Sequence, residues 1–274
     1  MEQLLEPFRG EIGRRALIEV VLLGLACGPL GVWVVLYRSS YAAESLAHGM
    51  LPGLVLAALA GAPLLLGALG GVLVAGALVA LAGRDQRIGA DTGVAVAVTG
   101  LFGLGAVLAL SPQTPPRLQE LLFGDLLGVT RPDLAIAGVL AVVVIAGLAA
   151  AHRPLSAAAL DPTSASTLGA PPARVGLGIV LALSLTTAVA VQALGNLLVV
   201  ALVVAPGAAA LVSADRLRAI LPISAGVAIA AGVLGLELSH HLEIAAGAAI
   251  GLCALAALPV AYLAAAARPG AAGG

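Results

Sequence analysis

Predominantly apolar segments of about 20 residues, the length that spans a bilayer as a helix, recur along the whole chain. Within the hydrocarbon core, a backbone satisfies its own hydrogen bonds only as a helix or a closed barrel. Hydrophobic residues make up 61% of the 274 residues and charged residues only 10%, against roughly 25% in soluble domains. We therefore expect an all-α, polytopic transmembrane helical bundle that forms a single domain over residues 1–274.

About nine segments meet this criterion, with approximate boundaries. They cover residues 17–36, 41–60, 64–81, 88–110, 134–151, 175–194, 197–212, 220–238 and 245–264. We expect a kink at Gly28-Pro29 in the first segment and a break at Pro206-Gly207 in the seventh, because proline removes a helical hydrogen bond. Residues 1–15 form a polar N-terminal segment that does not read as a cleavable signal peptide.

Two polar stretches interrupt this pattern. The first, residues 111–132, is rich in proline, and residues 117–123 within it are expected to form a short interfacial helix. The second is the loop at residues 153–174. There Asp161 can cap a helix whose first residue is Pro162, and Gly169 follows its end. These signals predict a short free-standing helix inside the second loop.

The charged residues exclude several classes of protein. All thirteen basic residues are arginine, so the chain has no Gly-Lys-Ser/Thr phosphate-binding loop and cannot be a P-loop ATPase itself. The net charge of -1 argues against a nucleic-acid partner. Cys27 and Cys253 both lie in apolar runs, where small buried hydrophobic residues are expected rather than a disulfide or metal thiolates.

The candidate chemistry lies in two Glu-x-x-x-His pairs, Glu44 with His48 and Glu237 with His241. Residues four apart share one face of a helix, so each carboxylate and imidazole can point at the same ion. Together they would offer two carboxylates and two neutral imidazoles, which suit Zn²⁺, Mn²⁺ or Fe²⁺. The pattern predicts a pathway for a divalent metal, with no permanently bound cofactor.

The alternative interpretation is that each pair is only a polar helix end. His240 is expected to have at most a supporting role, Asp91 to be a first-turn acid, and Glu19 to be interfacial. If all nine segments span and the 153–174 loop is cytoplasmic, the two pairs lie near opposite membrane faces. One shared site would then need a segment that is broken or does not cross.

From about Arg15 to Tyr262, the chain resembles the permease subunit of the bacterial ABC importers for zinc, manganese and iron. The family has Asp-x-x-x-His where this chain has Glu44 and His48, a change that lengthens the carboxylate stem by one carbon. The stretches that carry the resemblance are Gly31–Arg38 with Glu44–His48, Leu122–Thr130, Leu160–Gly169, Gly195–Ala210 and Ala246–Leu252.

The resemblance implies a multi-pass permease of the bacterial cytoplasmic (inner) membrane, which works by alternating access. It implies a homodimer, with ATP bound only by a separate cytoplasmic ABC ATPase that docks at the Leu155–Ala173 coupling loop. It also implies an extracytoplasmic metal-binding protein that delivers the ion, and a metal path through Glu44, His48, Glu237 and His241. The chain itself is then a transport subunit and not an enzyme.

Zinc is the first choice of cargo, with manganese and iron(II) as alternatives that the same ligands accept. Three other functions stay open. A cobalamin or iron-chelate permease would share the scaffold but needs no paired Glu-x-x-x-His. An ion-coupled secondary transporter would be indicated by an inverted repeat, and none is evident. An intramembrane metallohydrolase would be expected to carry His-Glu-x-x-His, which the stretch around His241 does not match.

Overall fold

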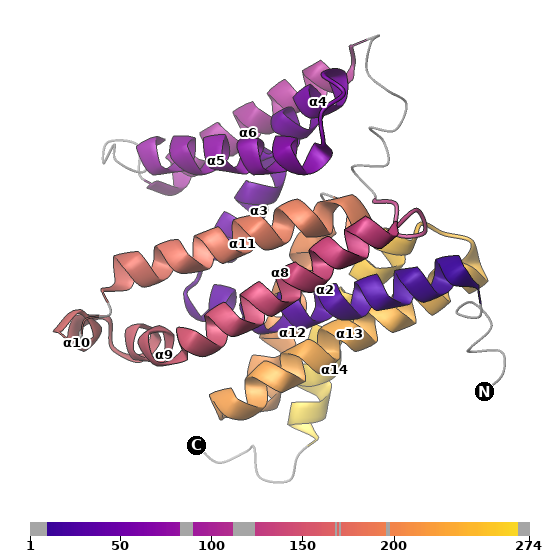
Figure 1. The fold of residues 1–274 in the computed structure, drawn as a ribbon. Helices are drawn as coiled ribbons and strands as arrows, with labels where there is room; N and C mark the ends of the chain where they lie inside the picture. Colours follow the sequence, from indigo (N-terminus) through magenta and orange to yellow (C-terminus); the bar gives the residue numbers. More distant parts are fainter. Residues whose placement is uncertain are drawn as a thin grey trace.

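The computed structural model describes residues 10–82, 90–111, 124–167, 169, 171–195 and 198–267, and these are helices joined by short connections, without a strand (Figure 1). The helices are α2 Glu11–Leu36, α3 Ser40–Gly49, α4 Leu51–Leu59, α5 Leu64–Ala82, α6 Ala90–Ala109, α8 Arg131–Ala150, α9 His152–Leu160, α10 Pro162–Thr167, α11 Pro172–Leu194, α12 Val199–Ser213, α13 Leu217–Leu242 and α14 Ala246–Ala266. The all-α prediction is confirmed.

Five of these helices, α2, α8, α11, α13 and α14, are long and apolar enough to cross a membrane. The four shorter apolar helices fall within residues 43–59, 64–78, 95–109 and 199–213. Every predicted segment therefore corresponds to helix in the described part of the chain, and α5 and α6, with 19 and 20 residues, are close to α8 in length. Large apolar side chains such as Val139 and Val142 on α8, and Leu255 and Leu263 on α14, are exposed and suit contact with lipid.

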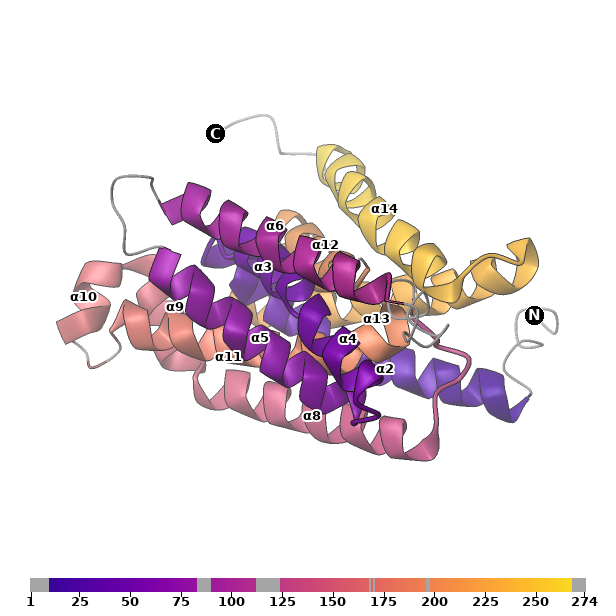
Figure 2. The same ribbon diagram turned by 90° about the horizontal axis from the view of Figure 1, so that it is seen from above.

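The helices form two groups. The core packs α2, α12, α13 and α14 against one another, with α8 and α11 alongside. Helices α4, α5 and α6 pack together as a separate layer, which α3 joins to the rest (Figures 1 and 2). Helix α3 thus connects the two groups, and α5 also contacts α11 directly.

Close approach of backbones holds α2 against α12. A Cβ atom added to Gly31 would lie 1.8 Å from the carbonyl oxygen of Val203, and one added to Gly207 would lie 2.5 Å from the carbonyl carbon of Gly31. Small residues are common where membrane helices meet, because the gain there comes from tight packing. The contact leaves no room for a side chain at Gly31 or Gly207, so it requires glycine at both positions.

The helices are interrupted at a different place from the one predicted. The helix at residues 41–60 is divided at Met50 into α3 and α4, because Pro52 lies in the first turn of α4 and has no N–H to continue α3. The break predicted at Pro206 was wrong, since α12 continues through it. Helix α2 is continuous through Pro29, and the kink predicted there stays a prediction. Helix α2 already begins at Glu11, inside the segment predicted as polar.

The short helix predicted within the 153–174 loop is confirmed as α10. The backbone N–H of Thr163 donates to Oδ1 of Asp161 at 3.0 Å, and Gly169 has φ of +79°. The first half of the same loop is also helical, as α9, because Pro154 falls in its first turn, where proline is tolerated. The interfacial helix predicted at residues 117–123 lies outside the described residues.

Candidate functional site

Glu44 and His48 lie on α3, which packs against α5, α6 and α11. The Glu44 side chain is exposed and His48 is half-buried. Nδ1 of His48 is 2.9 Å from the backbone carbonyl oxygen of Glu44. Because a carbonyl oxygen only accepts, Nδ1 carries a proton, and in the neutral imidazole Nε2 then keeps its lone pair. A hydrogen bond from one ring nitrogen is the usual way in which a metal-binding histidine is oriented.

The His48 ring is also fixed from its other side. Its centroid lies 5.4 Å from that of Phe102 on α6, with the two planes tilted by 47°. The imidazole is therefore held between its own helix and the α4–α6 layer, while Glu44 four residues earlier is exposed. This pair offers one oriented nitrogen donor and one exposed carboxylate.

Glu237 and His241 lie in the last turns of α13. Glu237 is buried, His241 is exposed, and their Nε2 and Oε2 atoms are 3.6 Å apart, too far for a hydrogen bond. Oε2 of Glu237 has no hydrogen-bond partner in the described structure. The helix ends at Glu243, which adopts a left-handed conformation with φ of +54°. This pair therefore stands at a polar helix end, as the alternative interpretation expected, but it also contains a buried, unsatisfied carboxylate.

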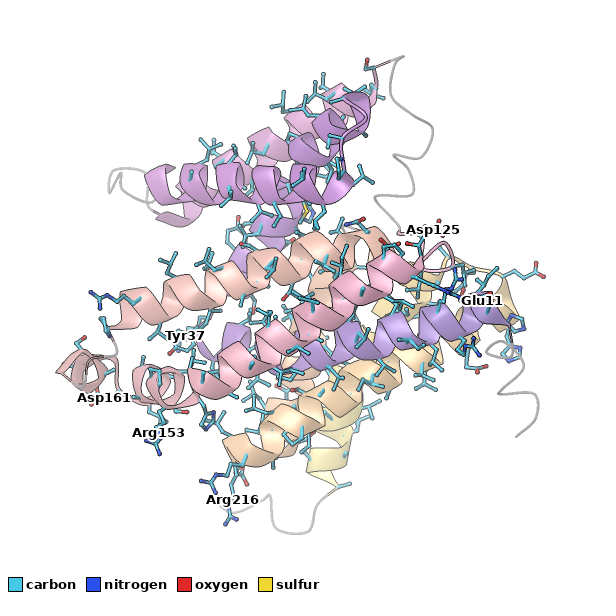
Figure 3. The ribbon with its side chains drawn as sticks, viewed as in Figure 1. Glu11, Tyr37, Asp125, Arg153, Asp161 and Arg216 are labelled. Atoms are coloured by element: carbon cyan, nitrogen blue, oxygen red, sulfur yellow. The ribbon has the colours of Figure 1, made fainter. Side chains whose placement is uncertain are left out.

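The two pairs lie toward opposite ends of the bundle. Gly24 and Gly28 of α2 face Ile229 and Ser224 of α13, so these helices run antiparallel and Glu237 lies near the N-terminal end of α2. Glu44 follows the C-terminal end of α2, which is 26 residues long and so about 39 Å in length. Figure 3 shows Glu11 and Tyr37 marking these two ends.

Among the described residues, no three His, Cys, Asp or Glu side chains are grouped so that they could hold one ion. A single site made from both pairs is therefore absent from this arrangement of the chain. Each pair supplies at most two donors, and an ion bound there would keep water or other ligands. The role of the four residues in metal binding stays a prediction.

Sequence reasoning missed Glu19. It was expected to be interfacial, yet only 2% of the residue is exposed, and its Oε2 has no hydrogen-bond partner in the described part of the chain. The position of Glu19 near the start of an apolar run gave no sign of this burial. This burial results from α8 and α11 packing against α2.

His240, which was expected to have at most a supporting role, is exposed, with its ring 5.5 Å from that of His241.

Comparison with known proteins identifies the scaffold. The sequence profile of the ABC 3 transport family matches residues 10–265. The chain belongs to the ABC 3 transport family. It is the permease subunit of an ABC transporter and a multi-pass protein of the cytoplasmic membrane, and the resemblance drawn from the sequence is confirmed.

Curated relatives in this family match over most of their length. A "Probable iron transport system membrane protein" of Haemophilus influenzae is 31% identical, over 90% of this chain and 91% of the relative. A "Manganese transport system membrane protein MntC" of Halalkalibacterium halodurans is 31% identical, over 91% of this chain and 86% of the relative. A "Chelated iron transport system membrane protein YfeD" of Yersinia pestis is 30% identical, over 89% and 82% of the two chains.

Two solved structures share the fold of this chain. A chain of "PsaBC from Streptococcus pneumoniae in complex with Fab" has a TM-score of 0.87 at 24% identity, covering 95% of both chains. "An inward-facing conformation of a putative metal-chelate type ABC transporter" has a TM-score of 0.73 at 17% identity, covering 92% of this chain and 86% of the other. The helical arrangement is therefore one that ABC permeases adopt.

Proposed function

We propose that this chain is the membrane permease of an ABC importer for a divalent transition metal ion, and that it moves the ion by alternating access without hydrolysing ATP itself. The observation that carries the proposal is the orientation of His48, whose Nδ1 is bound to a carbonyl so that Nε2 is free to bind a metal. Family membership and relatives named for manganese and iron support the same cargo class.

The ion would pass Glu44 and His48 on α3, and Glu237 and His241 at the end of α13. The separation of the two pairs fits successive positions along one path better than one shared site. Two donors at each position suit transport, because a permeating ion must bind well enough to shed water yet leave again. Neither pair contains a thiolate, which would hold a transition metal more firmly.

Carboxylate and imidazole ligands accept Mn²⁺, Fe²⁺ and Zn²⁺. The names of the relatives support manganese and iron, while the zinc prediction has no such support and stays a prediction. Manganese is the cargo that we propose to test first, because Glu44 adds a flexible oxygen donor, and oxygen ligands suit this ion.

The working complex would be a homodimer of this chain with two ATPase subunits and a metal-delivering protein outside the cell. The ATPase would dock at residues 155–173, where α9 and α10 stand at one end of the bundle (Figure 3). Tyr37 at the end of α2 donates a 2.8 Å hydrogen bond to the carbonyl of Leu155 in α9. Movement of α9 would reach the transmembrane core through this bond.

The test is uptake by proteoliposomes that contain this chain, its ATPase and its binding protein, supplied in turn with radioactive manganese, iron(II), zinc, a ferric chelate and cobalamin. We expect uptake of a free divalent ion, and we expect this uptake to require ATP on the side of the membrane where the ATPase is bound. Uptake of only the chelate or cobalamin would contradict the proposed cargo. Uptake that follows a proton or sodium gradient without ATP would contradict the proposed mechanism.

A further inference from the structure

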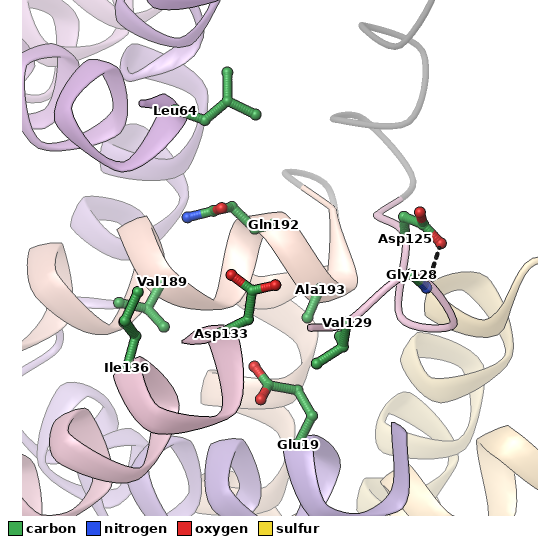
Figure 4. Close-up of a pocket in the computed structure, with 10 residues that line it drawn as sticks. All are labelled: Glu19, Leu64, Asp125, Gly128, Val129, Asp133, Ile136, Val189, Gln192 and Ala193. Carbon is green, nitrogen blue, oxygen red and sulfur yellow. Dashed lines mark hydrogen bonds between the residues drawn. The ribbon is translucent and has the colours of Figure 1, made fainter. Parts of the chain in front are cut away.

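A second group of polar side chains surrounds a cavity of 260 Å³ between α2, α8 and α11, apart from both Glu-x-x-x-His pairs. Its polar lining includes Glu19, Asp125, Asp133 and Gln192 (Figure 4). Asp133 is in the first turn of α8, whereas α9 follows the other end of that helix. The cavity is therefore at the end of the bundle opposite α9 and α10.

Glu19 is the unusual member of this group. It is 98% shielded from solvent, its Oε2 has no hydrogen-bond partner in the described structure, and its carboxylate points into the cavity toward Asp133 (Figure 4). A buried polar group without a partner is costly, and an ionisable residue within a membrane segment is by default a functional one. Packing alone does not explain a carboxylate here, since an apolar side chain would fill the same volume.

Asp133 is held in place from its own helix. Its Oδ2 accepts hydrogen bonds from the Thr130 backbone N–H at 2.9 Å and from the Thr130 hydroxyl at 2.5 Å. This capping box fixes the side chain beside the cavity. Two carboxylates that face one small space repel each other unless a proton or a cation lies between them.

We infer that Glu19 and Asp133 bind a hydrated divalent cation, with the side-chain carbonyl of Gln192 as a further oxygen donor. All of these donors are oxygens, the ligands that Mg²⁺, Mn²⁺ and Ca²⁺ prefer. Two carboxylates with retained water are a common set for such an ion. A water fills about 30 Å³ of liquid, so the cavity holds an ion with several waters. If α9 and α10 face the ATPase, as the proposed function requires, this site stands at the outer mouth.

Electron paramagnetic resonance of bound Mn²⁺ tests this site directly. The sample is the full chain with its ATPase in phosphatidylcholine nanodiscs, with no transport required, so the outcome is separate from that of the uptake assay. An ion at His48 or His241 couples to an imidazole nitrogen, whereas an ion at Glu19 and Asp133 does not. We expect a population of bound Mn²⁺ without nitrogen coupling in the wild type and in His48→Ala, beside any ion bound at the histidines, and the loss of this population in Glu19→Gln.

Two variants control for charge and folding. Glu11→Gln removes an exposed carboxylate from the same helix and is expected to keep the nitrogen-free signal. Glu19→Asp keeps the charge on a shorter stem and is expected to retain the signal with weaker affinity. The inference is overturned if Glu19→Gln elutes as a monodisperse complex and still binds as much Mn²⁺ without nitrogen coupling as Glu11→Gln does. It is also overturned if the wild type binds no Mn²⁺ without nitrogen coupling.

Discussion

The hydroxyl of Tyr37 donates a 2.8 Å hydrogen bond to the backbone carbonyl of Leu155, 118 residues later in the chain. Tyr37 directly follows the last residue of α2, and Leu155 is buried in α9. Burial raises the pKa of the Tyr37 phenol above its usual value, so the hydroxyl remains a donor throughout the physiological range. The bond joins the core of the bundle to the segment that we propose contacts the ATPase.

Tyr37→Phe removes this bond and keeps the ring. The loss should destabilise the contact between α2 and α9 by about 1 kcal/mol. We expect the variant to assemble with the ATPase but to hydrolyse more ATP for each ion transported than the wild type. The ratio of ATP hydrolysed to metal taken up in proteoliposomes measures this coupling. An unchanged ratio would show that the Tyr37 bond does not transmit movement.

Asp161→Ala should weaken α10 by removing the acceptor for the Thr163 N–H. Loss of an N-cap typically costs about 0.5 to 2 kcal/mol. The expected result is weaker binding of the ATPase to this chain, measured by surface plasmon resonance on the complex in nanodiscs. Asp161→Asn is the matched control, since asparagine caps equally well. Equal loss in both variants would assign the effect to the charge of Asp161 rather than to the cap.

Gly31→Ala should disrupt the contact between α2 and α12, because the new Cβ atom would meet the Val203 carbonyl oxygen. Overpacking of this kind costs about 1 to 3 kcal/mol. We expect a lower thermal unfolding midpoint in detergent micelles. Gly226→Ala on α13 is the control, since a Cβ atom there meets nothing within 4 Å. Similar midpoints for the two variants would contradict this account of the helix packing.

Local sequence patterns predicted most of the helices. The apolar segments predicted the helices because a bilayer leaves the backbone few alternatives, and Asp161-Pro162 predicted α10 because a cap acts on its own helix. Other features could not be predicted because they depend on contacts between distant segments. Helix α12 continues through Pro206, which is buried, and α8 and α11 bury Glu19.

The candidate site likewise has features that could be predicted from local spacing and features that could not. The spacing of Glu44 and His48 predicted that they share one helix, and both lie on α3. The hydrogen bond that fixes His48, however, runs to the backbone of Glu44 and not to its carboxylate. The spacing of Glu237 and His241 carried no information on which of the two would be buried, or on how far this pair lies from the first.

The most direct test of metal import through α3 is the initial rate of ATP-driven manganese uptake by His48→Ala. This variant removes Nε2, the donor that the Glu44 carbonyl orients. Loss even of a group that supports a metal ligand lowers affinity or activity by about 10- to 100-fold, so we expect at least about a tenfold fall. His240→Ala, which removes an exposed imidazole, should transport at the wild-type rate. If His48→Ala assembles with the ATPase and transports manganese as fast as His240→Ala, the proposed metal path is contradicted.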